Sequence, residues 1–152
     1  MLQLVDNNKL ERREWISVLS RAPLEMLESW IARTGAPAHT WLRRPETGLA
    51  MVRARAGGSG EQFNLGEITI TRCALRLEGG ASGVAYVQGR SHRKAELAAL
   101  ADALLQTSLA GQIEKELVEP VRAHLKDAAE KMQRKAQATR VEFFTLAREA
   151  GE

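Results

Sequence analysis

The feature that most constrains the fold of this sequence is a change of hydrophobic period in the middle of the chain. From Leu49 to Ala56, small residues alternate with larger or charged ones, which is typical of a β-strand with one small-residue face. A run rich in Ile and Thr follows from Phe63 to Leu77, and a shorter run covers Val84 to Gln88. Because glycine-rich segments separate these runs, they predict an antiparallel meander of about four strands.

Helical periodicity flanks this region on both sides. Residues 8–21 predict a first helix, and a second is predicted between Pro23 and Gly35, since proline suits a helix start and glycine a helix end. After Gly89 an apolar stripe predicts a third helix, with Ser91 as its N-cap. Residues 109–138 continue in helical period, with a break or kink at Pro120. The order predicts one α+β domain over residues 1–152: two N-terminal helices, the sheet, then C-terminal helices.

Two shorter segments add to this outline. The run Arg44-Pro45-Glu46-Thr47-Gly48 predicts a turn, because proline presets the bend and glycine tolerates positive φ. Residues 139–146 have strand composition, which predicts either a final strand at the sheet edge or a last helical turn.

The totals indicate an ordinary globular protein. The chain has 152 residues, 44% of them hydrophobic and 27% charged. No apolar run approaches the roughly 18 to 20 residues that would span a bilayer, and the first residues lack the pattern of a signal peptide. The single cysteine, Cys73, cannot form an internal disulfide. We therefore expect a cytoplasmic protein without a membrane segment.

Positive charge is concentrated in the middle third of the sequence. Net charge is only +3, yet residues 43–94 carry nine basic groups against four acidic ones. Most of the nine are arginines, whose planar guanidinium suits phosphates and carboxylates. This distribution indicates either an anion-binding region or solvated strand faces.

The sequence contains no self-contained catalytic site. Its three histidines, His39, His92 and His124, are far apart, and none stands at metal-ligand spacing with Cys73 or another histidine. Nucleophile-elbow, phosphate-loop and dinucleotide patterns are all missing. We predict no catalytic residue, no metal site and no cofactor on this chain alone.

One segment has the composition of a phosphate site. Arg90, Ser91, His92 and Arg93 lie where a strand is followed by a helix, and Lys94 comes next. A helix N-terminus offers free backbone N–H groups and the positive end of the dipole, both of which favour anions. The alternative is a capped helix start whose charges are solvated.

Two adjacent aromatic residues near the C-terminus, Phe143 and Phe144, are candidate interface residues. On a strand, neighbouring side chains point to opposite faces, so one ring would enter the core while the other needs cover from elsewhere. A partner protein would provide that cover.

Several segments, in order along nearly the whole chain, resemble the PhnG family of phosphonate-metabolism proteins. They are Arg12-Arg13-x-Trp15, Arg44 to Met51, Phe63 to Glu67, Thr71-Arg72-Cys73, Gly89-Arg90, the stripe Ala95 to Gln106, and Ala138 to Thr145. The family commonly has an aspartate after the glycine–arginine pair, where this chain has Ser91. Both residues cap helices.

The resemblance implies a function that composition cannot show. Proteins of this family join subunits H, I and J in the carbon–phosphorus lyase core complex, with the G subunit most directly against subunit I. The complex displaces adenine from Mg-ATP by a phosphonate, giving α-D-ribose 1-methylphosphonate 5-triphosphate. The resemblance therefore implies an accessory subunit of a transferase complex, with Mg-ATP as a substrate of the complex.

Two other functions are compatible with the residues. One is a small nucleic-acid-binding module that uses the basic middle region, although aromatic residues for base stacking make up only 5% of the chain. The other is an independent enzyme acting on a phosphorylated substrate. The absence of a base–nucleophile pair in the sequence argues against this function.

Overall fold

Two helices open the chain, and both were predicted from the sequence. The computed structural model describes the backbone of residues 2–149 and the side chains of residues 11–139. Helix α1 spans Leu2–Ser20 and α2 spans Leu24–Thr34. Pro23 precedes α2, and Gly35 ends it at a φ of 79° while donating its N–H to the Ile31 carbonyl at 2.8 Å. The predicted limits of the second helix are confirmed, because both residues act through their special backbone conformations.

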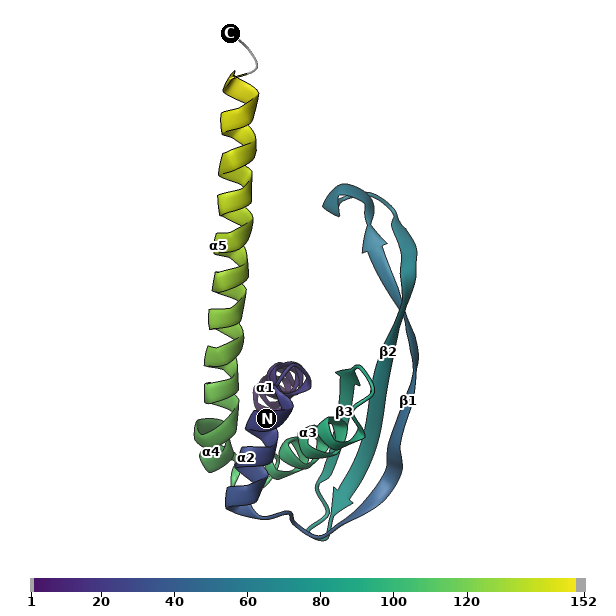
Figure 1. The fold of residues 1–152 in the computed structure, drawn as a ribbon. Coiled ribbons are helices and arrows are strands. Elements are labelled where there is room, and N and C mark those ends of the chain that lie inside the picture. The colour runs from purple at the N-terminus through teal and green to yellow at the C-terminus, as the bar shows by residue number, and fades with distance from the viewer. Residues whose placement is uncertain (1, 150–152) are drawn as a thin grey trace. The chain divides into compact units, whose positions relative to one another are not determined.

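The sheet has three antiparallel strands rather than about four. Strand β1 covers His39–Arg55, β2 covers Gln62–Leu77 and β3 covers Ser82–Gln88, in the spatial order β1-β2-β3. A short 3-10 turn, η1 (Ala56–Gly58), lies in the predicted glycine-rich loop between the first two strands. Strand β3 pairs with β2 only from Ile70 to Arg76, whereas β1 follows β2 along its whole length. Beyond β3, the first two strands therefore form a two-stranded ribbon (Figure 1).

The predicted turn at residues 44–48 is wrong, because this segment lies inside β1. Pairing shifts by one residue between Arg43, opposite Ala74, and Glu46, opposite Arg72. Proline has no N–H to donate to a sheet, but Pro45 lies in a bulge of an edge strand, where such a donor is not required. Proline and glycine here bend the strand without ending it.

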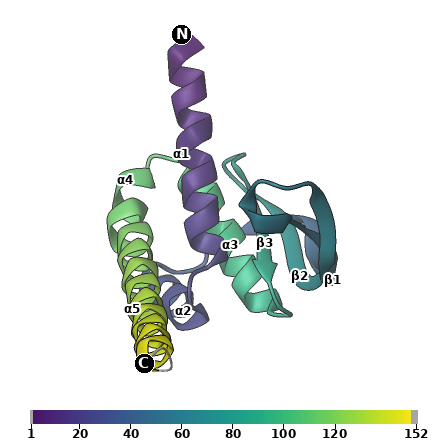
Figure 2. The same cartoon turned by 90° about the horizontal axis from the view of Figure 1, so that it is seen from above.

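Helix α3 (His92–Leu104) covers one face of the sheet. It packs on β2 and β3 with one side and on α1 and α2 with the other, so most of its circumference is buried (Figure 2). Gly83 in β3 permits this close approach, since a Cβ there would collide with the Ala99 carbonyl of α3. The core of this part of the protein consists of α3 and the side chains around it, including Leu75, Leu97 and Trp30.

The remaining helices follow with one irregularity. Helix α4 (Ala110–Ile113) continues through a π-helical turn, η2 (Glu114–Val118), into α5 (Glu119–Glu149). In η2 the N–H of Glu119 donates to the carbonyl of Glu114, five residues earlier. Pro120 has no N–H and would crowd a regular helix, which accounts for a wider turn at this point. The predicted break at Pro120 is thus a π-turn within a continuous helical path.

No final strand is present among the residues whose backbone is described, since residues 139–149 belong to α5. Extending the helix from the Ala- and Lys-rich stretch before these residues costs less than nucleating a new element, and this outweighs their strand composition. The chain divides into two compact units, Met1–Val121 and Arg122–Glu152. The sheet, α1 to α4 and η2 all belong to the first unit.

Candidate functional site

The residues of the predicted phosphate site lie at a capped helix start, and one of its two arginines is paired with carboxylates. The Ser91 hydroxyl accepts the N–H of Lys94 at 3.1 Å, so the predicted N-cap is confirmed. Arg93 is exposed and pairs with Glu96 at 3.1 Å, with Glu28 also within 3.9 Å. Arg90 is exposed and forms no ion pair with any described side chain. Of the two predicted arginines, Arg90 is therefore the one whose charge remains available.

His92 connects this helix start to the sheet. Its Nε2 and the Thr47 hydroxyl are hydrogen-bonded at 3.1 Å, and Thr47 also bonds the hydroxyl of Thr71 at 3.0 Å. Thr71, fully buried, donates to the carbonyl of Gly89 at 2.7 Å. The chain of bonds joins β1, β2 and the first turn of α3, and it gives His92 a positioning role that the sequence did not predict.

Beside this chain of bonds lies a shallow cavity of about 350 Å³ with a carboxylate on its wall. Glu46 accepts bonds from Arg43 and Arg72, both at 2.7 Å. These bonds hold the pKa of Glu46 below its ordinary value and that of Arg72 above its own. Two of the arginines in the basic middle region are thus paired with an acidic neighbour.

A buried carboxylate that the sequence analysis did not single out joins three elements. Asp102 of α3 is fully buried and accepts the Val84 N–H of β3 at 2.9 Å. From α1, Arg12 donates to it at 2.9 and 3.2 Å, and the Trp15 indole N–H donates at 2.8 Å. The hydrogen bond to Asp102 raises the pKa of Arg12. The spacing of Arg12 and Trp15 on one helical face was the available signal, but the carboxylate 90 residues away was not readable.

Cys73 is a core residue rather than a reactive thiol. It is buried between the sheet and α3, and burial raises the pKa of its thiol to about 12. The thiol therefore stays protonated at neutral pH, and a thiolate is the form that reacts. Among the described residues, no group of three or more His, Cys, Asp or Glu side chains could hold a metal ion.

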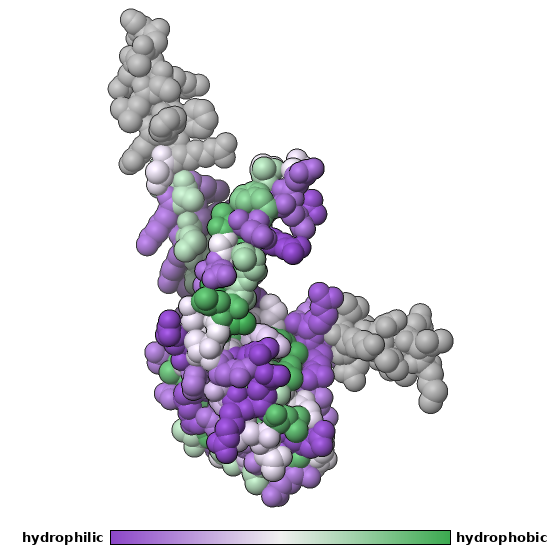
Figure 3. All heavy atoms as spheres, turned by 90° about the vertical axis from the view of Figure 1, so that its right-hand side faces the viewer, coloured by the Kyte–Doolittle hydropathy of each residue, from purple (hydrophilic) through white to green (hydrophobic). Residues whose placement is uncertain are grey.

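Among the residues whose side chains are described, large exposed hydrophobic side chains gather on the ribbon beyond β3, which we call the arm. It comprises residues 49–69, from the end of β1 through η1 to the start of β2. Four large hydrophobic side chains lie exposed on it: Leu49 (65%), Met51 (53%), Phe63 (46%) and Leu65 (64%). Figure 3 shows hydrophobic residues gathered there. Large exposed apolar patches mark interaction sites, and a two-stranded ribbon is marginally stable in water by itself.

The candidate interface residues Phe143 and Phe144 have side chains outside the described residues. Their backbone belongs to α5. The strand geometry assumed for them is wrong, because neighbouring residues on a helix are separated by about 100° rather than pointing to opposite faces. In the part of the chain that the structure describes, no helix is both long and apolar enough to cross a bilayer.

One family of known proteins matches nearly the whole length of the chain. The family described as phosphonate metabolism protein PhnG matches residues 10–149. The chain belongs to the PhnG family. It is 40% identical over 144 residues to a protein of Rhizobium meliloti (strain 1021) named alpha-D-ribose 1-methylphosphonate 5-triphosphate synthase subunit PhnG. That match covers 94% of this chain and 92% of the relative.

Family membership changes the interpretation of several motifs. Among the segments that resemble the PhnG family, Arg12 and Trp15 hold Asp102, and Gly89 accepts the bond from Thr71. These residues position α1 and α3 against the sheet. The PhnG-like segment Phe63 to Glu67, and the last three residues of the segment Arg44 to Met51, instead lie on the arm. The first group of PhnG-like segments holds the fold together, and the second group is exposed on the arm.

Proposed function

We propose that this chain is an accessory subunit of an α-D-ribose 1-methylphosphonate 5-triphosphate synthase in phosphonate catabolism. In this role it assembles with subunits H, I and J, most directly with I, and supports displacement of adenine from Mg-ATP by a phosphonate. Support comes from the relative of nearly equal length that is named as a subunit of this synthase. Mg-ATP is then a substrate of the assembly, and this chain carries no cofactor of its own.

The observation that carries the subunit role is the exposed arm. Its side chains Leu49, Met51 and Leu65 are each more than half exposed. Burying such side chains stabilises an assembly by about 1.5 to 3 kcal/mol each at most, before the cost of association. A partner surface over the arm supplies the cover that α3 supplies to the other half of β2.

Arg90 is the residue of this chain that we propose for an anion of the substrates. It stands at the start of α3 and has no ion pair with a described side chain. Ser91 and His92 hold the helix start in place, while Arg93 is shared with Glu96 and Glu28. A triphosphate or phosphonate oxygen then meets one free guanidinium and the first N–H groups of the helix.

The nucleic-acid-binding alternative gains no specific support. Arg43, Arg72 and Arg93, three of the basic groups in the middle region, are paired with carboxylates. Phosphate-backbone binding depends on unpaired cations and falls steeply with salt. Salt-dependent binding of an oligonucleotide by the lone chain would favour this alternative.

The experiment that tests the proposal combines co-purification with an adenine-release assay. The chain, co-expressed with subunits H, I and J of its own organism, should purify in one complex that releases adenine from Mg-ATP and methylphosphonate. The isolated chain should release none. Adenine release by the lone chain, abolished by a substitution within it, would contradict the accessory role.

Phe143 and Phe144 remain candidates for the contact with subunit I. An aromatic residue at the centre of an interface typically costs about 2 kcal/mol or more on truncation. Phe143→Ala and Phe144→Ala should be compared for co-purification with subunit I and for circular dichroism of the isolated chain. Equal binding by both variants and the parent would remove the two residues from the interface.

A further inference from the structure

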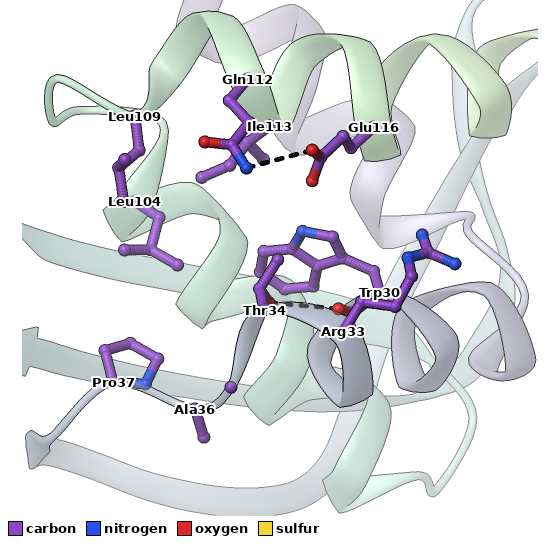
Figure 4. Close-up of a pocket in the computed structure, with 11 residues that line it drawn as sticks. Trp30, Arg33, Thr34, Ala36, Pro37, Leu104, Leu109, Gln112, Ile113 and Glu116 are labelled. Atoms are coloured by element: carbon purple, nitrogen blue, oxygen red, sulfur yellow. Dashed lines mark hydrogen bonds between the residues drawn. The ribbon is translucent and has the colours of Figure 1, made fainter.

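A second surface of the first unit, away from the arm, contains a cavity of about 630 Å³ (Figure 4). Its walls come from α2, the segment after α2, the end of α3, and the α4–η2 turn. Leu104, Leu109 and Ile113 supply apolar surface, and Arg33, Gln112 and Glu116 supply polar groups. A volume of this size is in the range of about 300 to 1,000 Å³ found for binding pockets.

The indole N–H of Trp30 is an unpaired donor in the wall of this cavity. Trp30 is fully buried, and its Nε1 is the only buried polar side-chain atom in the described part of the chain without a hydrogen-bond partner. Figure 4 shows this nitrogen on the edge of the ring that faces Gln112 and Glu116. By contrast, the Trp15 indole N–H bonds Asp102 at 2.8 Å. Buried polar groups are nearly always paired, so an acceptor is expected at Trp30 when the protein is in its working state.

The polar groups around the cavity indicate what kind of acceptor fits. The Gln112 amide donates to the carboxylate of Glu116 at 3.0 Å, leaving that carboxylate as a further acceptor. Arg33 adds one positive charge, which balances the charge of Glu116. A phosphate carrying several negative charges would be repelled by Glu116. The Trp30 donor, the Glu116 acceptor, the balanced charges of Arg33 and Glu116, and the apolar walls match an amide group attached to an apolar side chain.

We propose that this cavity receives a polypeptide segment of another synthase subunit. An apolar side chain of that segment enters the cavity, and a backbone carbonyl beside it accepts the Trp30 indole N–H. The segment's backbone N–H has Glu116 as its acceptor. The π-turn η2 positions Glu116 on the cavity wall, and π-turns are frequent at functional sites. This inference rests on the proposed subunit function, but it uses a surface separate from the arm.

The test compares variants of the cavity in assembly with subunits H, I and J of the same organism. Trp30→Phe removes the donor and leaves the partner's carbonyl unpaired, so we expect assembly about 5- to 150-fold weaker, measured as a Kd. Ala36→Trp places bulk on the exposed cavity rim without changing the core, and it should weaken assembly at least about 10-fold. Ala32→Trp is the matched control, since Ala32 is exposed on α2 and does not line the cavity.

The outcomes separate this inference from the proposed function. Failure of the unsubstituted chain to assemble would reject the subunit role itself. Assembly of the parent with unchanged Kd for both Trp30→Phe and Ala36→Trp would leave the subunit role intact and overturn the cavity inference. If Ala36→Trp assembles normally but adenine release by the complex falls, the occupant is a small molecule and the polypeptide assignment is wrong. Unfolding of each isolated variant, followed by circular dichroism, establishes that affinity is compared between folded chains.

Discussion

Strand β2 has one half that is covered by a helix and one half that is exposed to solvent. From Thr71 to Leu77 every second side chain is buried beneath α3, whereas from Gln62 to Glu67 every residue is exposed. The cause is length. A helix of 13 residues spans about 20 Å, while a strand of 16 residues spans about 50 Å, so α3 covers less than half of β2. The covered half makes the core, and the uncovered half makes a surface available to a partner.

The largest effect is expected from breaking the anchor of the covered half. Asp102→Ala should lower the free energy of unfolding by about 3 to 5 kcal/mol, because it removes the buried charge that pairs with Arg12 and the acceptor of the Trp15 and Val84 N–H groups. Denaturant unfolding of the isolated chain measures this loss. Asp127→Ala, which removes only an exposed pair with Lys131, should cost less than about 1 kcal/mol. Similar losses for the two variants would mean that Asp102 does not hold α1 to the sheet.

A matched pair of leucines on β2 tests the comparison directly. Leu75 is fully buried and Leu65 is exposed on the arm. Leu75→Ala should cost about 2 to 5 kcal/mol of stability, whereas Leu65→Ala should stay within about 0.5 kcal/mol. Co-purification with subunits H, I and J should show the opposite ranking. Among folded chains, Leu65→Ala should weaken assembly more than Leu75→Ala does. Unchanged assembly for Leu65→Ala, Leu49→Ala and Met51→Ala together would show that the arm is not an interface.

The anion role of Arg90 predicts an effect on turnover without an effect on the fold. A charge-assisted hydrogen bond is worth about 1.5 to 3 kcal/mol, so Arg90→Ala should reduce adenine release by the assembled complex roughly 10- to 150-fold. Arg76→Ala is the control, because Arg76 is exposed near the β2–β3 turn and bonds only Ser82 among described side chains. Equal turnover for the two variants would leave Arg90 as a solvated charge. Normal turnover per complex with less complex formed would assign it to an interface.

The smallest expected effect is a pH dependence at the base of the arm. Bonds from Arg43 and Arg72 lower the pKa of Glu46 from its ordinary value of 4.5. A lowered folded-state pKa contributes stability above the unfolded value, and this contribution is lost as pH falls through the lowered pKa. Amide chemical shifts of residues 43–48 and 70–74 should therefore change below about pH 4.5, and Glu46→Gln should remove that transition. A transition that persists in Glu46→Gln would belong to another carboxylate.

The sequence by itself determined the local elements of this protein and the order in which they occur. Pro23, Gly35 and Ser91 determined helix limits through backbone conformation and capping. Alternation predicted the second half of β1, and the Ile- and Thr-rich composition predicted β2. Seven segments of the sequence also indicated the PhnG family. These signals are local, since each depends on residues within a few positions of one another.

Tertiary structure decided which of these residues are covered and which are paired. Pro45 and Gly48 have the composition of a turn, but pairing with β2 keeps them in one strand. Arg93 and Arg90 look equivalent in the sequence, yet only Arg93 forms ion pairs, with Glu96 and Glu28, among the described residues. Trp15 and Trp30 both lie on apolar helical stripes. The indole N–H of Trp15 donates to the distant Asp102, whereas that of Trp30 has no partner among the described residues. The physical reason is that burial and pairing depend on groups brought together across the fold, and their positions are not encoded in local periodicity.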